Sequence, residues 1–138
     1  MTAAEKLASH IRENSARLAA ACTACGACYQ ACPTAPHIPA LAGADPAAVM
    51  AGIRDLLRDG EGTPQAVAFA GACCKSGICT QACPEKLDAA FLMRLANLRV
   101  RGALGTARVP TKDDPGWSAR VKAFARLTMT EEEQTKWL

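Results

Sequence analysis

The chain has 138 residues and a formal net charge of +3, so we expect a single domain, and so mild a charge does not indicate nucleic acid binding. Alanine accounts for 30 residues and aromatic residues for only 4%, which limits the hydrophobic core that a short chain can form. The eight cysteines are therefore candidates for binding a metal group that holds the fold together. No apolar run is long enough to span a membrane, and the charged first residues show no signal peptide.

Helices, and no strands, are predicted along the chain, because Ala, Leu and Arg dominate and β-branched residues do not alternate with polar ones. The expected helices cover 3–20, 45–60, 63–73, 88–102 and 117–127, and a Thr130–Glu133 capping box begins the last turns. Residues 33–44 are predicted to form a Pro-rich connector and residues 103–116 an extended arm. The sequence therefore predicts an all-α fold, with a domain over 1–102 and a C-terminal arm and helix over 103–138.

The first cysteine motif is Cys22-x2-Cys25-x2-Cys28-x3-Cys32-Pro33. With no export signal, thiols are expected to stay reduced, so clustered cysteines favour a metal over disulfides. This spacing is typical of bacterial ferredoxins, where three thiolates hold one iron–sulfur cluster and the fourth ligates the other cluster. Zinc needs only four ligands, usually in two CxxC pairs, and fits the spacing less well.

The second cysteine motif is an internal copy of the first. Residues 72–84 repeat residues 21–33 with eight identical positions out of thirteen, which carries more weight than one motif alone. The copy aligns Cys73, Cys79 and Cys83 with the first, third and fourth cysteines of the first motif. It places Ser76 where the second cysteine is expected and adds Cys74 beside Cys73.

Crossed ligation between the two motifs predicts two sets of ligands. The set for the first cluster is Cys22, Cys25, Cys28 and Cys83. The set for the second cluster is Cys32, Cys73 and Cys79. Three thiolates suit a [3Fe–4S] cluster, which is the expectation beside one [4Fe–4S] cluster. A second [4Fe–4S] cluster would need Cys74 or Ser76 as an eighth ligand, and Cys74 can equally be a small buried hydrophobic residue.

The two motifs together resemble the C-terminal helical ferredoxin domain of the iron–sulfur subunits of succinate dehydrogenase and fumarate reductase. The resemblance covers about residues 20–102 and includes the helix start at residues 84–88. It implies an all-α helical ferredoxin with cluster-binding loops between short helices. It also implies a [4Fe–4S] cluster on the first motif and a [3Fe–4S] cluster on the second, whose non-Cys position matches Ser76. The layout is equally similar to the iron–sulfur subunit of heterodisulfide reductases that carries two full four-Cys motifs.

Electron transfer is the function that these motifs predict. Clusters of this kind pass single electrons, and the sequence shows neither a catalytic constellation nor a glycine motif for flavin or nicotinamide. We expect a non-catalytic subunit that relays electrons between a flavoprotein and another redox carrier. The alternative is a cluster-based redox or iron sensor, or a structural iron–sulfur subunit. His10 is expected on the surface, and His37 in an ordinary loop role.

A basic second half suggests a docking surface for an acidic partner, against the simpler interpretation of a solvated face. The residues concerned are Arg94, Arg99, Arg101, Arg108, Lys112, Arg120, Lys122 and Arg126. The arm over 103–116 and the tail with Trp117 and Trp137 are interpreted as a docking arm that wraps a partner, against the alternative that they fold back on the domain. A cytoplasmic location is expected, and peripheral attachment to a membrane complex is left open.

Overall fold

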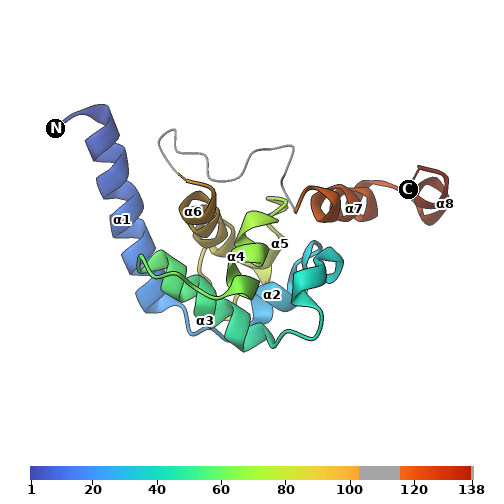
Figure 1. Ribbon diagram of the computed structural model, residues 1–138, viewed down its shortest axis with the longest axis horizontal. Coiled ribbons are helices and arrows are strands. Elements are labelled where there is room, and N and C mark those ends of the chain that lie inside the picture. Colours follow the sequence, from blue (N-terminus) through green and yellow to red (C-terminus); the bar gives the residue numbers. More distant parts are fainter. Residues whose placement is uncertain (103–115, 138) are drawn as a thin grey trace.

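The computed structural model describes residues 1–102 and 116–137, and every regular element in these ranges is helical, which confirms the all-α class (Figure 1). The elements of the first half are α1 (Ala3–Ala21), α2 (Ala27–Ala31), the short 3₁₀ turns η1 (Ala35–His37) and η2 (Pro39–Leu41), and α3 (Pro46–Leu57). Those of the second half are α4 (Pro64–Gly71), α5 (Ile78–Ala82), α6 (Ala89–Arg101), α7 (Trp117–Thr128) and α8 (Glu131–Trp137).

Side-chain caps begin the longer helices at the residues that the sequence predicts. Asp45, Thr63 and Asp88 each accept a hydrogen bond from the backbone N–H three residues later, at 3.0, 3.1 and 2.9 Å respectively. Thr130 and Glu133 form the expected capping box at the start of α8. Helix α1 begins in the same way, since Thr2 and Glu5 form a box of the same kind.

Two helix ends and the connector differ from the expectation. Helix α3 ends at Leu57 rather than Gly60, because Asp59 adopts a left-handed conformation (φ 63°) and closes a Schellman turn through the 2.8 Å bond from Gly60 N to Asp55 O. Helix α4 ends at Gly71, before Cys73. The Pro-rich connector contains η1 and η2, and each cysteine motif contains a short helix rather than a plain loop.

The duplication seen in the sequence extends to the backbone of both cysteine loops. Helices α2 and α5 each begin after a glycine in the left-handed region, Gly26 (φ 85°) and Gly77 (φ 77°). Two residues earlier, both loops place a non-glycine residue at positive φ, Ala24 at 55° and Lys75 at 61°. Each half is therefore a long helix, a cysteine loop, a short helix and a second long helix. The short helices α2 and α5 pack against each other.

The hydrophobic core lies where α3, α4 and α6 pack on one another. Its larger members include Met50, Ile53, Leu56, Phe69 and Leu92, each at most 4% exposed, and alanines fill much of the rest. Helix α1 contacts α3 and α6 through its C-terminal turns, and its N-terminal part extends away from the other helices (Figure 1). The core is small, as the composition predicts.

Helix α7 packs on η1 and at the end of α4, and does so through small residues. Ala119, Ala123 and Ala125 are buried, whereas Phe124 is 66% exposed. A Cβ on Gly116 would lie 2.8 Å from the Cα of Ala72, so the start of α7 touches the residue before the second cysteine loop. The apolar face that the sequence predicts for this helix therefore points outward. Apart from Gly116, the expected arm over 103–116 lies outside the described residues.

We expect Gly26→Ala to destabilise the fold more than Gly77→Ala. Both substitutions place a Cβ at positive φ, which costs about 1–2 kcal/mol. The Cβ at position 26 would also lie 2.6 Å from the Cβ of Pro46, whereas none of the neighbouring described atoms lies within 4 Å of a Cβ at position 77. Overpacking against the start of α3 adds about 1–3 kcal/mol. Urea unfolding followed by circular dichroism measures both losses, and equal losses would contradict the expectation.

Candidate metal centres

All eight cysteines are free thiols, and they line two neighbouring cavities. The first cavity lies between the first cysteine loop and the end of α5. Its cysteines are Cys22, Cys25, Cys28 and Cys83. Three of them come from the first motif and the fourth from the second motif. The structure thus brings together the four residues that crossed ligation predicts for one cluster.

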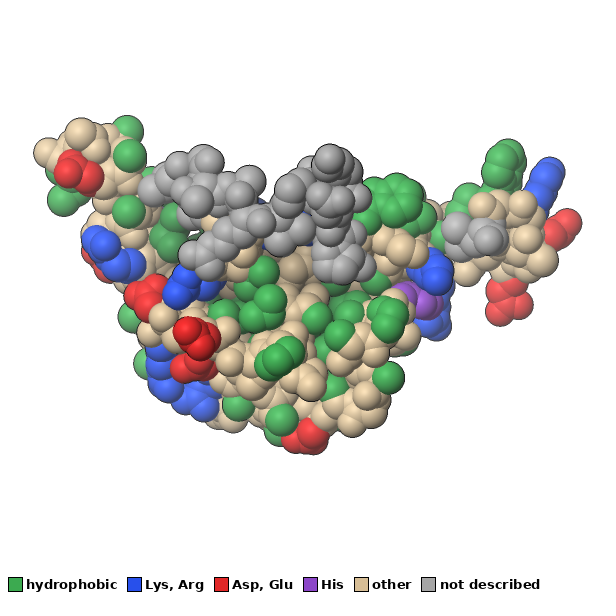
Figure 2. Space-filling view, in the orientation of Figure 1, with side chains coloured by type: hydrophobic (Ala, Val, Ile, Leu, Met, Phe, Trp, Pro, Cys, Tyr) green, Lys and Arg blue, Asp and Glu red, His purple; other side chains and the backbone are tan. Residues whose placement is uncertain are grey.

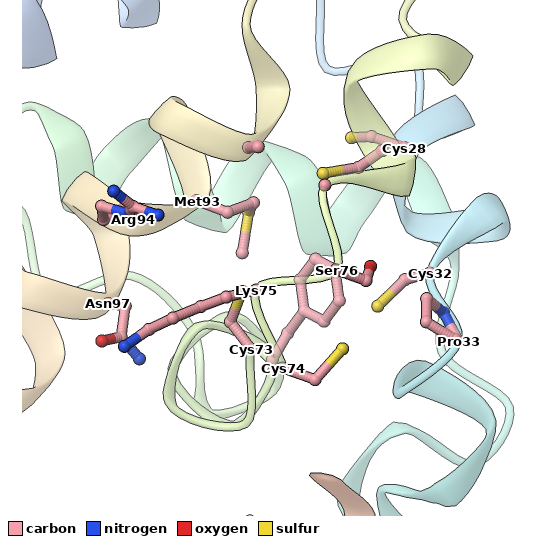
Figure 3. Close-up of a pocket in the computed structure, with 14 residues that line it drawn as sticks. Cys28, Cys32, Pro33, Cys73, Cys74, Lys75, Ser76, Met93, Arg94 and Asn97 are labelled. Atoms are coloured by element: carbon pink, nitrogen blue, oxygen red, sulfur yellow. The ribbon is translucent and has the colours of Figure 1, made fainter. Parts of the chain in front are cut away.

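The second cavity lies between the second cysteine loop, the end of α2 and one face of α6 (Figure 3). It contains the three cysteines expected for the second cluster, Cys32, Cys73 and Cys79. Cys74 and Ser76 line it as well, so both candidates for an eighth ligand border the same space. Its remaining walls include apolar side chains, basic side chains and an amide: Pro33, Phe69, Lys75, Ala90, Met93, Arg94 and Asn97.

The crossing of the two cysteine sets follows from the short helices. Cys28 lies in α2 and Cys32 ends it, so one turn of helix, about 6 Å long, separates their backbones. Because α2 lies beside α5, this turn carries Cys32 out of its own loop and into the cavity of the other. Cys83 ends α5, with an extended backbone conformation like that of Cys32, and it reaches the first cavity. Cys28 lines both cavities and forms part of the wall between them.

The thiols in these cavities are crowded and partly buried. Burial, together with the nearby thiols of Cys79 and Cys22, raises the pKa of Cys28 to about 12. Burial, together with Cys73 and Cys32, raises the pKa of Cys79 to about 11. Several thiolates cannot coexist there unless a cation offsets their charge, and bound metal deprotonates coordinating thiols. A multi-iron group fits this donor set.

Backbone N–H groups and two basic side chains oppose the effect of burial in the second cavity. Burial raises the pKa of Cys32, and the backbone N–H groups of Thr34 and Ala35 lower it. Burial also raises the pKa of Cys73, while the N–H of Lys75 and the charges of Lys75 and Arg94 lower it. Hydrogen bonds and charge of this kind are the means by which proteins tune iron–sulfur potentials.

Side chains from α6 and α7 hold the end of helix α4, directly before the second cysteine loop. Asn97 is buried and donates a 2.7 Å hydrogen bond to the carbonyl of Ala70. Arg101 and Arg120 both donate to the carbonyl of Gly71, at 3.0 and 3.1 Å. Carbonyls at a helix C-terminus lack helical partners and favour cationic donors. Two of the basic residues that the sequence analysis assigns to a surface, Arg101 and Arg120, thus also position the loop.

Three further expectations concern single residues. Ser76 is exposed, and its hydroxyl accepts a 3.4 Å hydrogen bond from the N–H of Ile78. His10 is exposed, as expected. His37 is half-buried between basic groups: burial and the charges of Arg126 and Lys122 lower its pKa. Neither histidine lines the first or the second cavity.

Both cavities are narrow, about 40 Å³ for the second and about 20 Å³ for the first. A cubane cluster is larger, so cysteine side chains would have to turn outward to hold one. Among residues 1–102 and 116–137, no three His, Cys, Asp or Glu side chains converge tightly enough for a single metal ion. The same residues include no helix that is long and apolar enough to cross a membrane.

Comparison with known proteins identifies the segment that carries the cysteines. Residues 21–88, about half of the chain, match the family model of the 4Fe-4S dicluster domain. Neither a curated protein nor a solved structure matches the chain significantly. The matched segment begins one residue before Cys22 and ends at the cap of α6, so it contains both cavities' cysteines. The match supports iron–sulfur clusters of the 4Fe-4S type, metal binding and a role in electron transfer.

We expect Asn97→Ala to destabilise the protein by about 1–3 kcal/mol, because it leaves the buried carbonyl of Ala70 without its 2.7 Å donor. The EPR signal of the second cluster should weaken as well, because the end of α4 positions Cys73. Asn14→Ala on α1 is the matched control, since its amide bonds lie on an exposed helix surface. Urea unfolding and EPR of the two variants test this, and equal behaviour of both would contradict it.

Proposed function

We propose that the chain relays single electrons between two redox proteins through two adjacent iron–sulfur clusters. The observation that carries this proposal is the wall at Cys28, which borders both cysteine-lined cavities. Two redox centres on either side of one residue form a path, whereas a single centre would suffice to cross-link so small a fold. The family match of residues 21–88 supports the same role.

The proposed ligands of the first cluster, a [4Fe–4S] cluster, are Cys22, Cys25, Cys28 and Cys83. Those of the second cluster are Cys32, Cys73 and Cys79. Iron–sulfur clusters supply reversible one-electron reduction when bound. The chain's own contribution is to hold them with thiolates, to donate N–H groups to the sulfurs, and to place the charges of Lys75 and Arg94 beside the second cavity.

For the second cavity we propose a [3Fe–4S] cluster on three thiolates. Ser76 occupies the position of Cys25 in the duplicated loop, and its hydroxyl already accepts a bond from the N–H of Ile78. A serine hydroxyl is also a far weaker iron ligand than a thiolate at neutral pH. The fourth corner of the cluster is then open.

A full [4Fe–4S] cluster with Cys74 as the eighth ligand is the second candidate. Cys74 lines the second cavity, and Figure 3 shows its sulfur directed toward Cys32. The pKa of Cys32 is raised first by burial and also by the neighbouring Cys74, which indicates that the two thiols lie close together. Against this candidate, Cys73 and Cys74 are consecutive residues, and adjacent side chains rarely reach one cluster from the same side.

The proposed partners are a flavoprotein on one side and a second redox carrier on the other, in a hetero-oligomeric complex. This follows the resemblance to the succinate dehydrogenase and heterodisulfide reductase subunits, in which a domain of this layout works beside other redox subunits. The cytoplasm, or the cytoplasmic face of a membrane complex, is the proposed location. A sensor or purely structural role is the competing function, and it requires no electron exchange with a partner.

Anaerobically purified protein is expected to contain about seven irons per chain, four from the first cluster and three from the second. A near-isotropic EPR signal should be present in the oxidised protein and vanish on reduction. A reduced flavoprotein should reduce the oxidised clusters again, because the proposed role is electron transfer. About eight irons with an EPR-silent oxidised protein would favour the second candidate. Stable clusters that exchange no electrons with any flavoprotein would sink the transfer role.

Two substitutions distinguish the candidates for the second cavity. Ser76→Cys restores the missing thiol of the duplicated motif, so we expect the iron content to rise by about one per chain and the oxidised EPR signal to disappear. Cys74→Ser should leave both unchanged if the cluster has three irons. A loss of iron and of the second cluster in Cys74→Ser would instead assign Cys74 as a ligand. Iron analysis and EPR of the same samples provide the measurement.

A further inference from the structure

We propose that a groove formed by the second cysteine loop and helix α7 is the docking surface for an acidic redox partner protein, which exchanges electrons with the second cluster there. This inference rests on the proposed function and adds the place and the chemistry of the contact. The groove has a volume of about 420 Å³. It is lined by Cys73, Cys74, Lys75, Trp117, Arg120, Val121 and Phe124.

The groove lies directly outside the second cavity. Cys73, Cys74 and Lys75 line both spaces, so one short stretch of backbone separates the proposed cluster from the groove. The floor is held in place by α7 itself, because Gly116 packs against Ala72 and Arg120 donates a hydrogen bond to the carbonyl of Gly71. A partner seated in the groove would therefore contact the wall of the second cluster site directly.

Large apolar side chains are exposed along the groove. Trp117 is 57% exposed and Phe124 is 66% exposed, although α7 buries three alanines on its other side. Figure 2 shows hydrophobic side chains over α7, with basic side chains and a histidine beside them. Aromatic residues in this setting are typical anchors of protein interfaces. Their exposure next to a redox site favours a protein partner over a small ion.

The charged side chains that line the groove, among the described residues, are basic. Among the described residues, its lining includes Lys75 and Arg120 and no acidic residue. Helix α7 also carries Lys122 and Arg126, on the side that faces His37 rather than in the groove, and it contains no Asp or Glu. The first cavity differs, since its one charged lining residue in the described part of the chain is Glu85. Basic side chains attract and orient an acidic surface, so Lys75 and Arg120 favour an acidic partner at this groove.

Stopped-flow oxidation of the reduced protein tests whether electrons leave the second cluster through this positively charged groove. Ferricyanide is an anionic one-electron oxidant and tris(phenanthroline)cobalt(III) a cationic one, and each accepts one electron from the protein. Lys122 and Arg126 lie outside the groove, but at low salt the Debye length of about 30 Å exceeds the width of α7, so their charges still act on an ion that approaches it. We therefore expect Lys122→Glu with Arg126→Glu to lower the rate of oxidation by ferricyanide severalfold at low salt and to raise the rate of oxidation by the cobalt complex. Rising salt should shrink both effects.

The matched control is Lys6→Glu with Arg12→Glu on α1, which changes the net charge by the same amount far from the groove (Figure 1). Iron content and reduction by dithionite are measured first in all three proteins. If iron content and reduction are normal and both double variants lower the rate of oxidation by ferricyanide equally, electrons do not leave through the groove and the inference is overturned. If the wild-type protein cannot be reduced and reoxidised at all, it is the proposed function that fails.

An acidic flavoprotein, flavodoxin, tests the apolar part of the surface. We expect Phe124→Ser to slow electron transfer to flavodoxin severalfold and to leave the ferricyanide rate unchanged, because only a protein contacts the aromatic anchor. Trp137→Ser is the control, since Trp137 is 68% exposed on α8 and does not line the groove. Electron transfer to flavodoxin should be faster from the wild-type protein than from Phe124→Ser or from Lys122→Glu with Arg126→Glu. Equal rates in all three proteins would exclude the groove as the docking surface.

Discussion

The packing of α2 against α5 is the contact on which the rest of the structure depends. Each of these helices is only five residues long and could not persist alone in water. Side by side, they carry Cys32 and Cys83 across to the opposite loops and so build two cavities rather than two separate motifs. The longer helices form a small core beside this pair, and their caps fix where each cysteine loop begins and ends.

The cysteine loops are held in a conformation that the backbone does not favour. Ala24 and Lys75 adopt positive φ at equivalent positions, at a cost of about 1–3 kcal/mol each. Contacts elsewhere must offset this cost: the bonds from Asn97 and the two arginines to the end of α4, and the weaker 3.5 Å bond from Arg58 to Ala19 at the end of α1. Strain of this kind is typical of loops whose shape serves a bound group.

Much of this arrangement could be predicted from the sequence, because its signals are local. Caps at Asp45, Thr63 and Asp88 predict helix starts, and the repeat with its cysteine spacing predicts which thiols share a cavity. The left-handed stop at Asp59 was missed because non-glycine residues seldom adopt that conformation. The roles of Asn97, Arg101 and Arg120 were missed because their acceptors lie 27 to 49 residues away. Which of Cys74 and Ser76 approaches a cluster stays a prediction, since both border the second cavity.

The shared composition of the two cavities also bears on how such a chain can arise. Either half contributes cysteines to both cavities and completes neither set by itself, because Cys83 completes one and Cys32 contributes to the other. A half-length ancestor with one motif would therefore have needed a second copy of itself to assemble either centre. Joining the two copies in one chain makes that encounter intramolecular. It also frees the halves to diverge, so that one can lose a cysteine at position 76 while the other keeps its full motif.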